Sequence, residues 1–64
     1  MKPRIVFNNE CGEGIAEVRS NVIPQIGNYV IIADPKKHDR RYKVYNVEIV
    51  YVFDDETIIY VTVI

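Results

Sequence analysis

The second half of the chain alternates between apolar and polar residues in the way that β-strands do. Three of its stretches consist mainly of β-branched and aromatic residues, which suit the pleated surface of a sheet: Asn28–Ala33, Arg41–Phe53 and Thr57–Ile64. Polar turn signals separate them, at Asp34–Arg40, which opens with Asp-Pro, and at Asp54–Glu56. Because short polar turns join consecutive strands into hairpins, the pattern predicts a C-terminal three-strand antiparallel meander.

The first third of the chain predicts two further short strands. Arg4–Phe7 contains an apolar run that ends at two asparagines. Gly14–Arg19 alternates, with alanine and valine on one side and glutamate and arginine on the other, as in a half-buried strand. The alternative for this segment is a short helix over Glu13–Ser20. Gly12 and Gly14 would then occupy its first turn, where glycine is unfavourable.

The longest predicted strand, Arg41–Phe53, is expected to bend. Thirteen residues at about 3.3 Å each would span roughly 43 Å, which is too long for a straight strand in so small a domain. Its apolar residues also change phase, because Tyr42 and Val44 share one parity and the odd positions from Tyr45 onward share the other. A bulge near Val44–Tyr45 would bend the strand and switch its inward face. Bent strands turn the corners of small barrels, so residues 1–64 are predicted to form a single all-β, five-stranded small barrel.

The turn at Asp54–Glu56 sets the pairing of the last two strands. A three-residue loop there would place Glu48 opposite Thr62, whereas a two-residue loop would set Glu48 against Val61. A slip of one residue exchanges the two faces of a strand, so the register that pairs polar with polar is preferred. The sequence therefore predicts the three-residue loop.

Both faces of this last hairpin are apolar. The face expected to point into the core carries Val47, Ile49, Tyr51, Ile59, Val61 and Val63. The opposite face carries Val50, Val52, Ile58, Tyr60 and Ile64. Contiguous exposed apolar patches mark interfaces, so these five residues are predicted to join copies of the chain in a homo-oligomer. The alternative is that the two N-terminal strands cover part of this face.

Length and composition limit how the fold is stabilised. The chain has 64 residues, one cysteine and one histidine, so it forms no internal disulfide and falls short of the four ligands of a structural zinc site. A domain this small is marginal on its own core, which leaves oligomerisation or a very efficient core. Its net charge is −1, it has no apolar run near the ~18 residues of a membrane span, and its N-terminus is unlike a signal peptide. These features predict a cytoplasmic protein with a reduced Cys11.

Positive charge is concentrated in one predicted loop. Residues 36–43 hold five positive charges and one negative charge, whereas Asp54–Glu56 hold three negative charges. Arginine forks bind phosphate at two points, lysines act as point charges, and tyrosine rings stack on bases. The candidate ligand-binding residues are Lys36, Lys37, His38, Arg40, Arg41, Tyr42 and Lys43. The alternative is a solvated hairpin tip that keeps the protein soluble and discourages edge pairing.

The remaining polar residues form no recognisable catalytic site. Cys11 lies beside Gly12 and Gly14, but a nucleophilic thiol needs a base, and nothing in the sequence places one nearby. Asp54–Glu56 are adjacent, so they cannot flank a substrate as acid and base, and they are too close together for a calcium loop. The sequence therefore predicts no enzyme activity, no cofactor and no metal.

One run of residues resembles a known architecture. It consists of Ile23–Ile32, which contains Pro24 and Gly27, followed by Tyr42-Lys43-Val44 and Val47. This order resembles the proline, glycine-polar, valine and tyrosine-x-valine run of small SH3-like barrels, which include KOW-type ribosomal and transcription-factor modules and many short phage proteins. The resemblance covers about residues 22–64 and implies a barrel that binds through its loops and edges. In KOW-type modules an acidic residue follows the glycine, and Asn28 stands there instead, so nucleic-acid binding is not carried over.

These patterns lead to two functional hypotheses. The first is a non-enzymatic, homo-oligomeric, phage-encoded binding module, whose loop at 36–43 binds the phosphates of a small nucleotide or a nucleic acid. The second is a protein-interaction module, or an inhibitor of a host protein, that acts through the apolar face or a strand edge. Salt dependence separates them, because phosphate contacts weaken steeply as salt rises and apolar docking does not.

Overall fold

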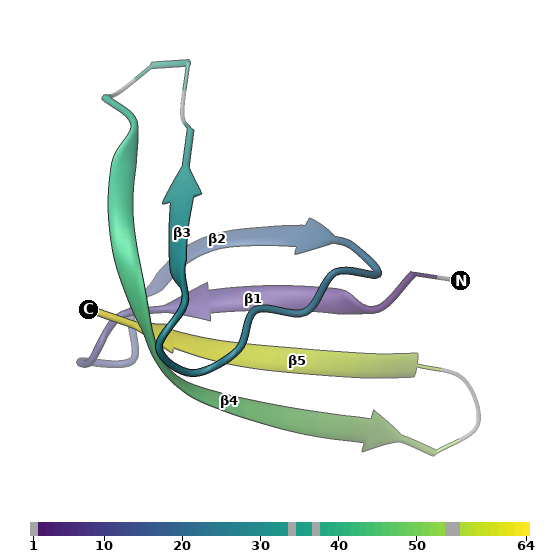
Figure 1. The fold of residues 1–64 in the computed structure, drawn as a ribbon. Helices are drawn as coiled ribbons and strands as arrows, with labels where there is room; N and C mark the ends of the chain where they lie inside the picture. The colour runs from purple at the N-terminus through teal and green to yellow at the C-terminus, as the bar shows by residue number, and fades with distance from the viewer. Residues whose placement is uncertain (1, 34, 37, 54–55) are drawn as a thin grey trace.

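All the regular secondary structure is β-strand in the part of the chain that the computed structural model describes, residues 2–33, 35–36, 38–53 and 56–64 (Figure 1). The five strands are β1 (Arg4–Asn8), β2 (Gly14–Arg19), β3 (Tyr29–Ile32), β4 (Arg40–Val52) and β5 (Glu56–Val63). Each lies within one residue of its predicted bounds, and the segment that also allowed a helix is the strand β2. The predicted all-β class is confirmed.

The strands form one sheet in the order β2-β1-β5-β4-β3. β1 pairs with β5 in parallel, and the other three pairings are antiparallel. The sheet curves strongly, so that β3 and the first half of β4 rise away from β1 and β5 (Figure 1). The result is a nearly closed five-stranded barrel, consistent with the small SH3-like barrel that the sequence predicts.

The bend in β4 lies at the predicted bulge. Val44 pairs with Val63 and Asn46 pairs with Thr62, so Tyr45 has no partner on β5. A straight strand of this length would span about 43 Å, which exceeds the 37 Å long axis of the protein. The extra residue bends the strand and lets its first half leave the plane of β1 and β5.

The pairing of β4 with β5 differs from the predicted register by two residues. Glu48 lies opposite Tyr60 and not Thr62, and the strands meet at Val52 and Glu56, which leaves positions 53–55 between them. Asp54 and Asp55 themselves lie outside the described residues. A shift of two keeps every side chain on its predicted face, so the apolar pattern alone did not distinguish the two registers. In the observed register the polar pair is formed by Asn46 and Thr62.

The core lies on the inner face of the curved sheet. Its buried residues are Ile5, Phe7, Val44, Ile59, Val61 and Val63. They meet across the strands, with Ile5 opposite Ile59 and Phe7 opposite Val61 in the parallel β1–β5 pairing. The partly buried residues packed around them come from β2, β3 and β4: Ile15, Ala16, Val30, Ile32, Tyr42 and Val47.

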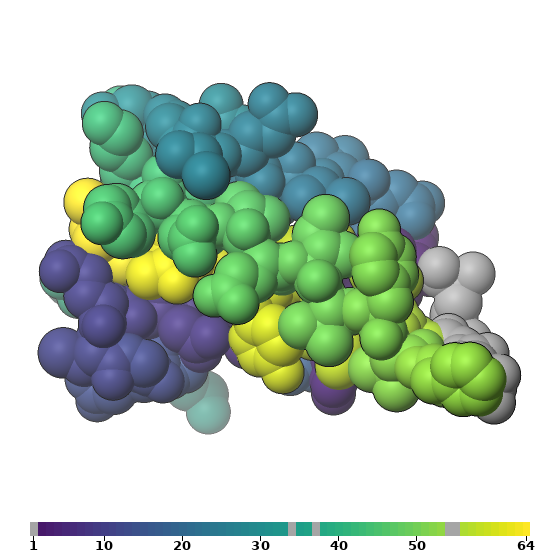
Figure 2. Space-filling view, turned by 90° about the horizontal axis from the view of Figure 1, so that it is seen from below, coloured from purple at the N-terminus to yellow at the C-terminus, as the bar shows by residue number. Residues whose placement is uncertain are grey.

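Two residues predicted to face the core are on the inner face but are not covered. Ile49 pairs with the fully buried Ile59, yet 48% of its surface is exposed, and Tyr51 is 78% exposed. Among the described residues β3 pairs with β4 only at Arg40–Lys43, so it does not extend over the inner face of the far half of β4. The end of β4 forms one extremity of the molecule, drawn in yellow-green in Figure 2.

The opposite face also departs in part from the predicted interface. Val50, Val52 and Tyr60 are exposed, but Ile58 is buried, flanked on its own face by Arg4 on β1 and Val50 on β4. Ile64 lies at the other end of β5, where its backbone exchanges hydrogen bonds of 2.9 Å with that of Lys43. The five predicted residues therefore do not form one continuous patch. β1 lies beside β5 in the same sheet, so it widens this face and does not cover it.

Candidate functional site

Strand pairing divides the basic stretch between the two faces of the sheet. Lys43 lies opposite Tyr29 and Arg41 opposite Ile31, whereas Tyr42 and Arg40 lie opposite Val30 and Ile32. Neighbouring residues of a strand point to opposite faces. Arg41 and Lys43 therefore share the outer face, and Arg40 and Tyr42 share the inner one.

On the inner face, Tyr42 belongs to the barrel and not to an open binding surface. It packs against the core cluster, and the Cζ atom of Arg40 lies 5.5 Å from the centroid of its ring. Both residues line a hollow of about 560 Å³ that also includes Cys11 and Ile15. Arg40 is exposed there, and its contact with Tyr42 orients the guanidinium along the barrel wall.

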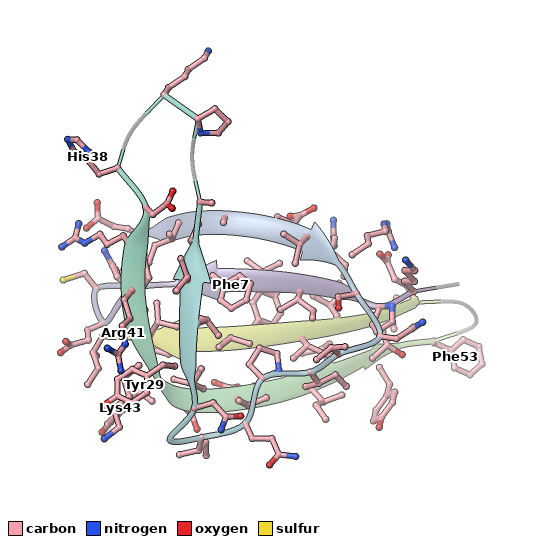
Figure 3. The ribbon with its side chains drawn as sticks, turned by 45° about the horizontal axis from the view of Figure 1, so that its top comes forward. Phe7, Tyr29, His38, Arg41, Lys43 and Phe53 are labelled. Carbon is pink, nitrogen blue, oxygen red and sulfur yellow. The ribbon has the colours of Figure 1, made fainter. Side chains whose placement is uncertain are left out.

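On the outer face, cations and tyrosines gather on two neighbouring strands. The Cζ atom of Arg41 lies only 4.1 Å from the centroid of the Tyr29 ring, and Lys43 is directly opposite Tyr29. Figure 3 shows these three side chains side by side. Tyr45, the unpaired residue of the bulge, follows on β4 and is 64% exposed. We call Tyr29, Arg41, Lys43 and Tyr45 the tyrosine–cation face.

The two cations of this face have no carboxylate partner among the described residues. The ion pairs of the described residues lie elsewhere, where Arg4 and Arg19 contact Glu17 and Glu56 at 3.4–3.8 Å. A guanidinium held over an aromatic ring keeps its N–H groups free at the ring's edge, where they can donate to an anion. The charges of Arg41 and Lys43 are thus available to a ligand.

The loop itself lies apart from the tyrosine–cation face. Lys36 and His38 are exposed on the segment between β3 and β4, and Lys37 lies outside the described residues. Figure 3 shows His38 near the tip of this segment, away from Tyr29, Arg41 and Lys43. The six described candidate residues are therefore spread over a loop, the inner face and the outer face of the sheet, and do not form one compact binding site.

Sequence reasoning missed Tyr29 as a member of the site. The sequence did contain a signal for it. If the predicted strands Asn28–Ala33 and Arg41–Phe53 pair in antiparallel, Tyr29 lies beside a basic residue of the second strand. The seven residues between β3 and β4 leave that register open, so the sequence did not fix which basic residue Tyr29 would meet.

A different kind of surface lies where the barrel fails to close. β2 pairs only with β1, and β3 pairs only with β4, as far as the described residues show. Between them is a hollow of about 600 Å³ with a mainly apolar lining: Ile5, Phe7, Ala16, Val18, Val30 and Ile32. Two strand edges with unpaired backbone groups beside an apolar floor can accept an extended peptide.

Other chemistry is sparse in the part of the chain that the structure describes. No three His, Cys, Asp or Glu side chains there are grouped so that they could hold a metal ion. Cys11 is a free, exposed cysteine on the turn between β1 and β2. None of the described elements is a helix with the length and hydropathy needed to cross a lipid bilayer.

Comparison with known protein families, with curated protein sequences and with solved structures finds no significant match to this chain.

Proposed function

We propose that the protein is a non-enzymatic binding module that holds a phosphate-bearing ligand, a nucleotide or a nucleic-acid strand, on its tyrosine–cation face. The observation that carries this proposal is the Arg41 guanidinium 4.1 Å from the Tyr29 ring, with Lys43 opposite that ring and no described carboxylate paired to either cation. The ligand site is thus the outer face of the β3–β4 hairpin, and the loop at 36–43 contributes only its last residues.

Each residue of the face has a distinct role in this proposal. Tyr29 orients Arg41, whose planar fork donates two hydrogen bonds to one phosphate. Lys43 supplies a point charge to the same or the next phosphate. Tyr45, exposed at the bulge, offers a ring on which a base stacks, a contact worth about 1–3 kcal/mol per base in single-strand binding proteins. A ligand that carries both phosphates and bases uses all four residues.

The form of the face favours an extended ligand over a small one. Tyr29, Arg41, Lys43 and Tyr45 lie on the surface of two paired strands, and none of them lines the hollows described above. Small molecules usually bind in concave sites that bury most of their surface. A single strand instead contacts successive exposed side chains along a sheet. The proposal extends to kinship with the KOW-type and short phage barrels that the sequence resembles, and to a cytoplasmic location, which suits the free thiol of Cys11.

The test is a titration of short single-stranded oligonucleotides, mononucleotides and cyclic dinucleotides against three proteins, followed calorimetrically over a series of salt concentrations. The proteins are the parent, Arg41→Ser/Lys43→Ser and the matched control Lys36→Ser/Arg40→Ser, which removes the same charge from the same segment. The first variant should bind at least about tenfold more weakly, and its log K against log salt slope should be shallower by about 1.4 for a single strand. The control should keep the parent's affinity and slope.

Two results would contradict the proposal. If no ligand binds the parent protein, the tyrosine–cation face is not a phosphate site. If the control loses as much affinity as Arg41→Ser/Lys43→Ser, binding depends on the summed charge of the segment and not on the outer face.

The second candidate function is protein binding through a strand edge, and the gap between β2 and β3 is the observation that favours it. An extended partner segment would pair with the free edge of β2 or β3 and place alternate apolar residues against Ile5 and Phe7. Its binding would persist at high salt, and Val18→Lys, which puts a charge on the inner rim of the gap, would abolish it. Salt-independent binding that Arg41→Ser/Lys43→Ser does not affect would favour this function over the first.

A further inference from the structure

The end of the β4–β5 hairpin exposes apolar side chains on both of its faces. Fourteen large hydrophobic side chains are exposed among the described residues, twice the seven that are buried. Five of the fourteen are consecutive, Ile49–Phe53, and we call this segment the hairpin end. Ile49 and Tyr51 lie on the inner face, Val50 and Val52 on the outer face. A run of exposed apolar residues this long is unfavourable in a free surface strand and is typical of an interaction surface.

The same chain carries an exposed aromatic side chain and a hollow that is partly lined by apolar residues. Phe53, at the tip of the hairpin end, is 90% exposed and points away from the barrel (Figure 3). A hollow of about 240 Å³ opens on the inner face. Its apolar lining residues include Pro3, Ile23, Ile49 and Ile59, and its polar lining residues are Lys2, Arg19, Glu56 and Thr57. Phe53 does not line this hollow in its own subunit. Large aromatic side chains that fill apolar pockets are the residues that contribute most at protein interfaces.

We propose that the protein self-associates as a symmetric dimer in which Phe53 of one copy occupies the hollow beside Ile23, Ile49 and Ile59 of the other. In a two-fold interface each contact occurs twice. Phe53 of each copy therefore fills the hollow of the other copy, and no second kind of partner is needed. The net charge of −1 gives little repulsion between copies.

The exposed apolar surface around the hollow supplies a large part of the area that such a dimer needs. With about 200 Å² for a fully exposed aromatic side chain, the exposed parts of Tyr51 and Phe53 amount to roughly 340 Å² per subunit. Ile23 and Ile49, which line the hollow and are 40% and 48% exposed, extend this area. A standard interface uses about 800 Å² of each partner. With one cysteine and therefore no internal disulfide, a 64-residue chain also gains from the second core that a dimer supplies.

The first experiment measures mass by light scattering at micromolar concentration. The parent should show twice the 7.5 kDa mass of one chain. Phe53→Lys should raise the dissociation constant at least about thirtyfold and shift the mass toward 7.5 kDa, with the β-type circular dichroism spectrum unchanged. Tyr45→Lys is the matched control, because Tyr45 is also an exposed aromatic residue of β4 but lies at the bulge, far from the hairpin end. It should leave the mass unchanged.

A second experiment tests the contact itself and does not depend on a charged variant folding. Two chains are prepared in the Cys11→Ser background, one with Ile23→Cys and one with Phe53→Cys, and are mixed in equal amounts under mild oxidation. A covalent heterodimer should dominate over both homodimers, because the proposed interface places position 53 of one subunit beside position 23 of the other. Chains with only the Cys11→Ser change should form no covalent product.

Three results would overturn the proposal. A parent mass of 7.5 kDa at micromolar concentration would mean that the hairpin end meets a different partner or none. A dimer that Tyr45→Lys separates and Phe53→Lys leaves intact would place the interface at the other end of β4. A mixture of the two cysteine chains that gives no excess of heterodimer would exclude the contact between Phe53 and the hollow, even if Phe53→Lys fails to fold.

Discussion

The two halves of β4 both place apolar residues on the inner face of the sheet, but these residues have opposite surroundings. Before the bulge, Tyr42 and Val44 pack against the core from the inner face. Beyond it, Ile49 and Tyr51 occupy that same inner face and remain exposed. The difference lies in β3, which pairs with the first half only and brings Val30 and Ile32 over the core there. Strand periodicity thus decides to which face a side chain points. The path of the rest of the chain decides whether another segment packs against that side chain.

The comparison also explains why the two candidate surfaces lie at opposite ends of one strand. In the first half the core occupies the inner face, so the proposed ligand surface is on the outer face, which carries Arg41 and Lys43. At the end of the second half, residues 49–52, the side chains of both faces are exposed and apolar. A surface of cations beside tyrosines suits a charged ligand, whereas a surface of aliphatic and aromatic residues suits a protein. The bulge at Tyr45 is the boundary between the two.

The largest expected effect comes from a pair of isoleucines that face each other across β4 and β5. Ile59 is fully buried and Ile49 is 48% exposed, although both are on the inner face. In the Phe53→Lys background, where association does not contribute, Ile59→Ala should lower the free energy of unfolding by about 2–4 kcal/mol, because it leaves a cavity in the core. Ile49→Ala should lower it by about 1 kcal/mol or less, since its side chain already contacts water. Urea denaturation followed by circular dichroism measures both.

The same two substitutions, Ile49→Ala and Ile59→Ala, test the comparison further when their unfolding free energies are measured in the parent chain. If the hairpin end is covered by a second copy, Ile49→Ala should cost more in the parent than in the Phe53→Lys background. Equal costs for Ile49→Ala and Ile59→Ala in the Phe53→Lys background would show that the two halves of β4 do not differ in the way described here.

An intermediate effect is expected at the glycine that joins the connection to the bulge. Gly27 has a φ of +92°, and its N–H donates a 2.9 Å hydrogen bond to the carbonyl of Val44. Gly27→Ala should destabilise the protein by about 1–2 kcal/mol, because an L side chain is strained in the left-handed region. Gly14→Ala is the matched control. Its φ is not positive, and an added Cβ would meet only Asn8 Oδ1 at 3.9 Å, so its stability should be unchanged or raised by up to about 1 kcal/mol. A loss at position 14 as large as that at position 27 would be inconsistent with this account, and thermal unfolding decides between them.

Local pattern in the sequence predicted the strands and the bulge, because both depend on neighbouring residues. The phase change between Val44 and Tyr45 is visible without any tertiary information, and the bulge lies there. The register of the β4–β5 hairpin was wrong by two residues, since a shift of two leaves each residue on the same face. The exposure of Ile49 was missed because it depends on where β3 begins, at Tyr29 opposite Lys43. The parallel pairing of β1 with β5 joins segments about fifty residues apart, and nothing in either strand alone encodes its partner.

For the candidate site, the sequence showed where along the chain the positive charges lie. It did not show to which face of the sheet each side chain points. The sequence placed Arg40 and Arg41 in one group because they are adjacent, and alternation along β4 separates them. Tyr29 belongs to the candidate site only because β3 pairs with β4, which places Tyr29 opposite Lys43. A prediction from sequence would need the register of that hairpin, which the intervening loop leaves open.

The smallest expected effect concerns the charges at the base of the hairpin end. Glu56 Oε1, on the first residue of β5, lies 3.6 Å from Arg4 Nε and 3.4 Å from the Arg19 Nη2. These side chains are about a third to a half exposed, so solvent screens the pairs, and Glu56→Gln should cost only about 0.5 kcal/mol at low salt. The difference from the parent should vanish at 1 M salt, where the Debye length falls to about 3 Å.

Glu48→Gln is the control, because no described cation pairs with that exposed carboxylate. It should change the free energy of unfolding by no more than roughly a few tenths of a kcal/mol at any salt concentration. Chemical denaturation in urea at two salt concentrations measures all of these values. A cost for Glu56→Gln that persists at 1 M salt would show that this side chain holds the far half of the hairpin by packing and not by charge.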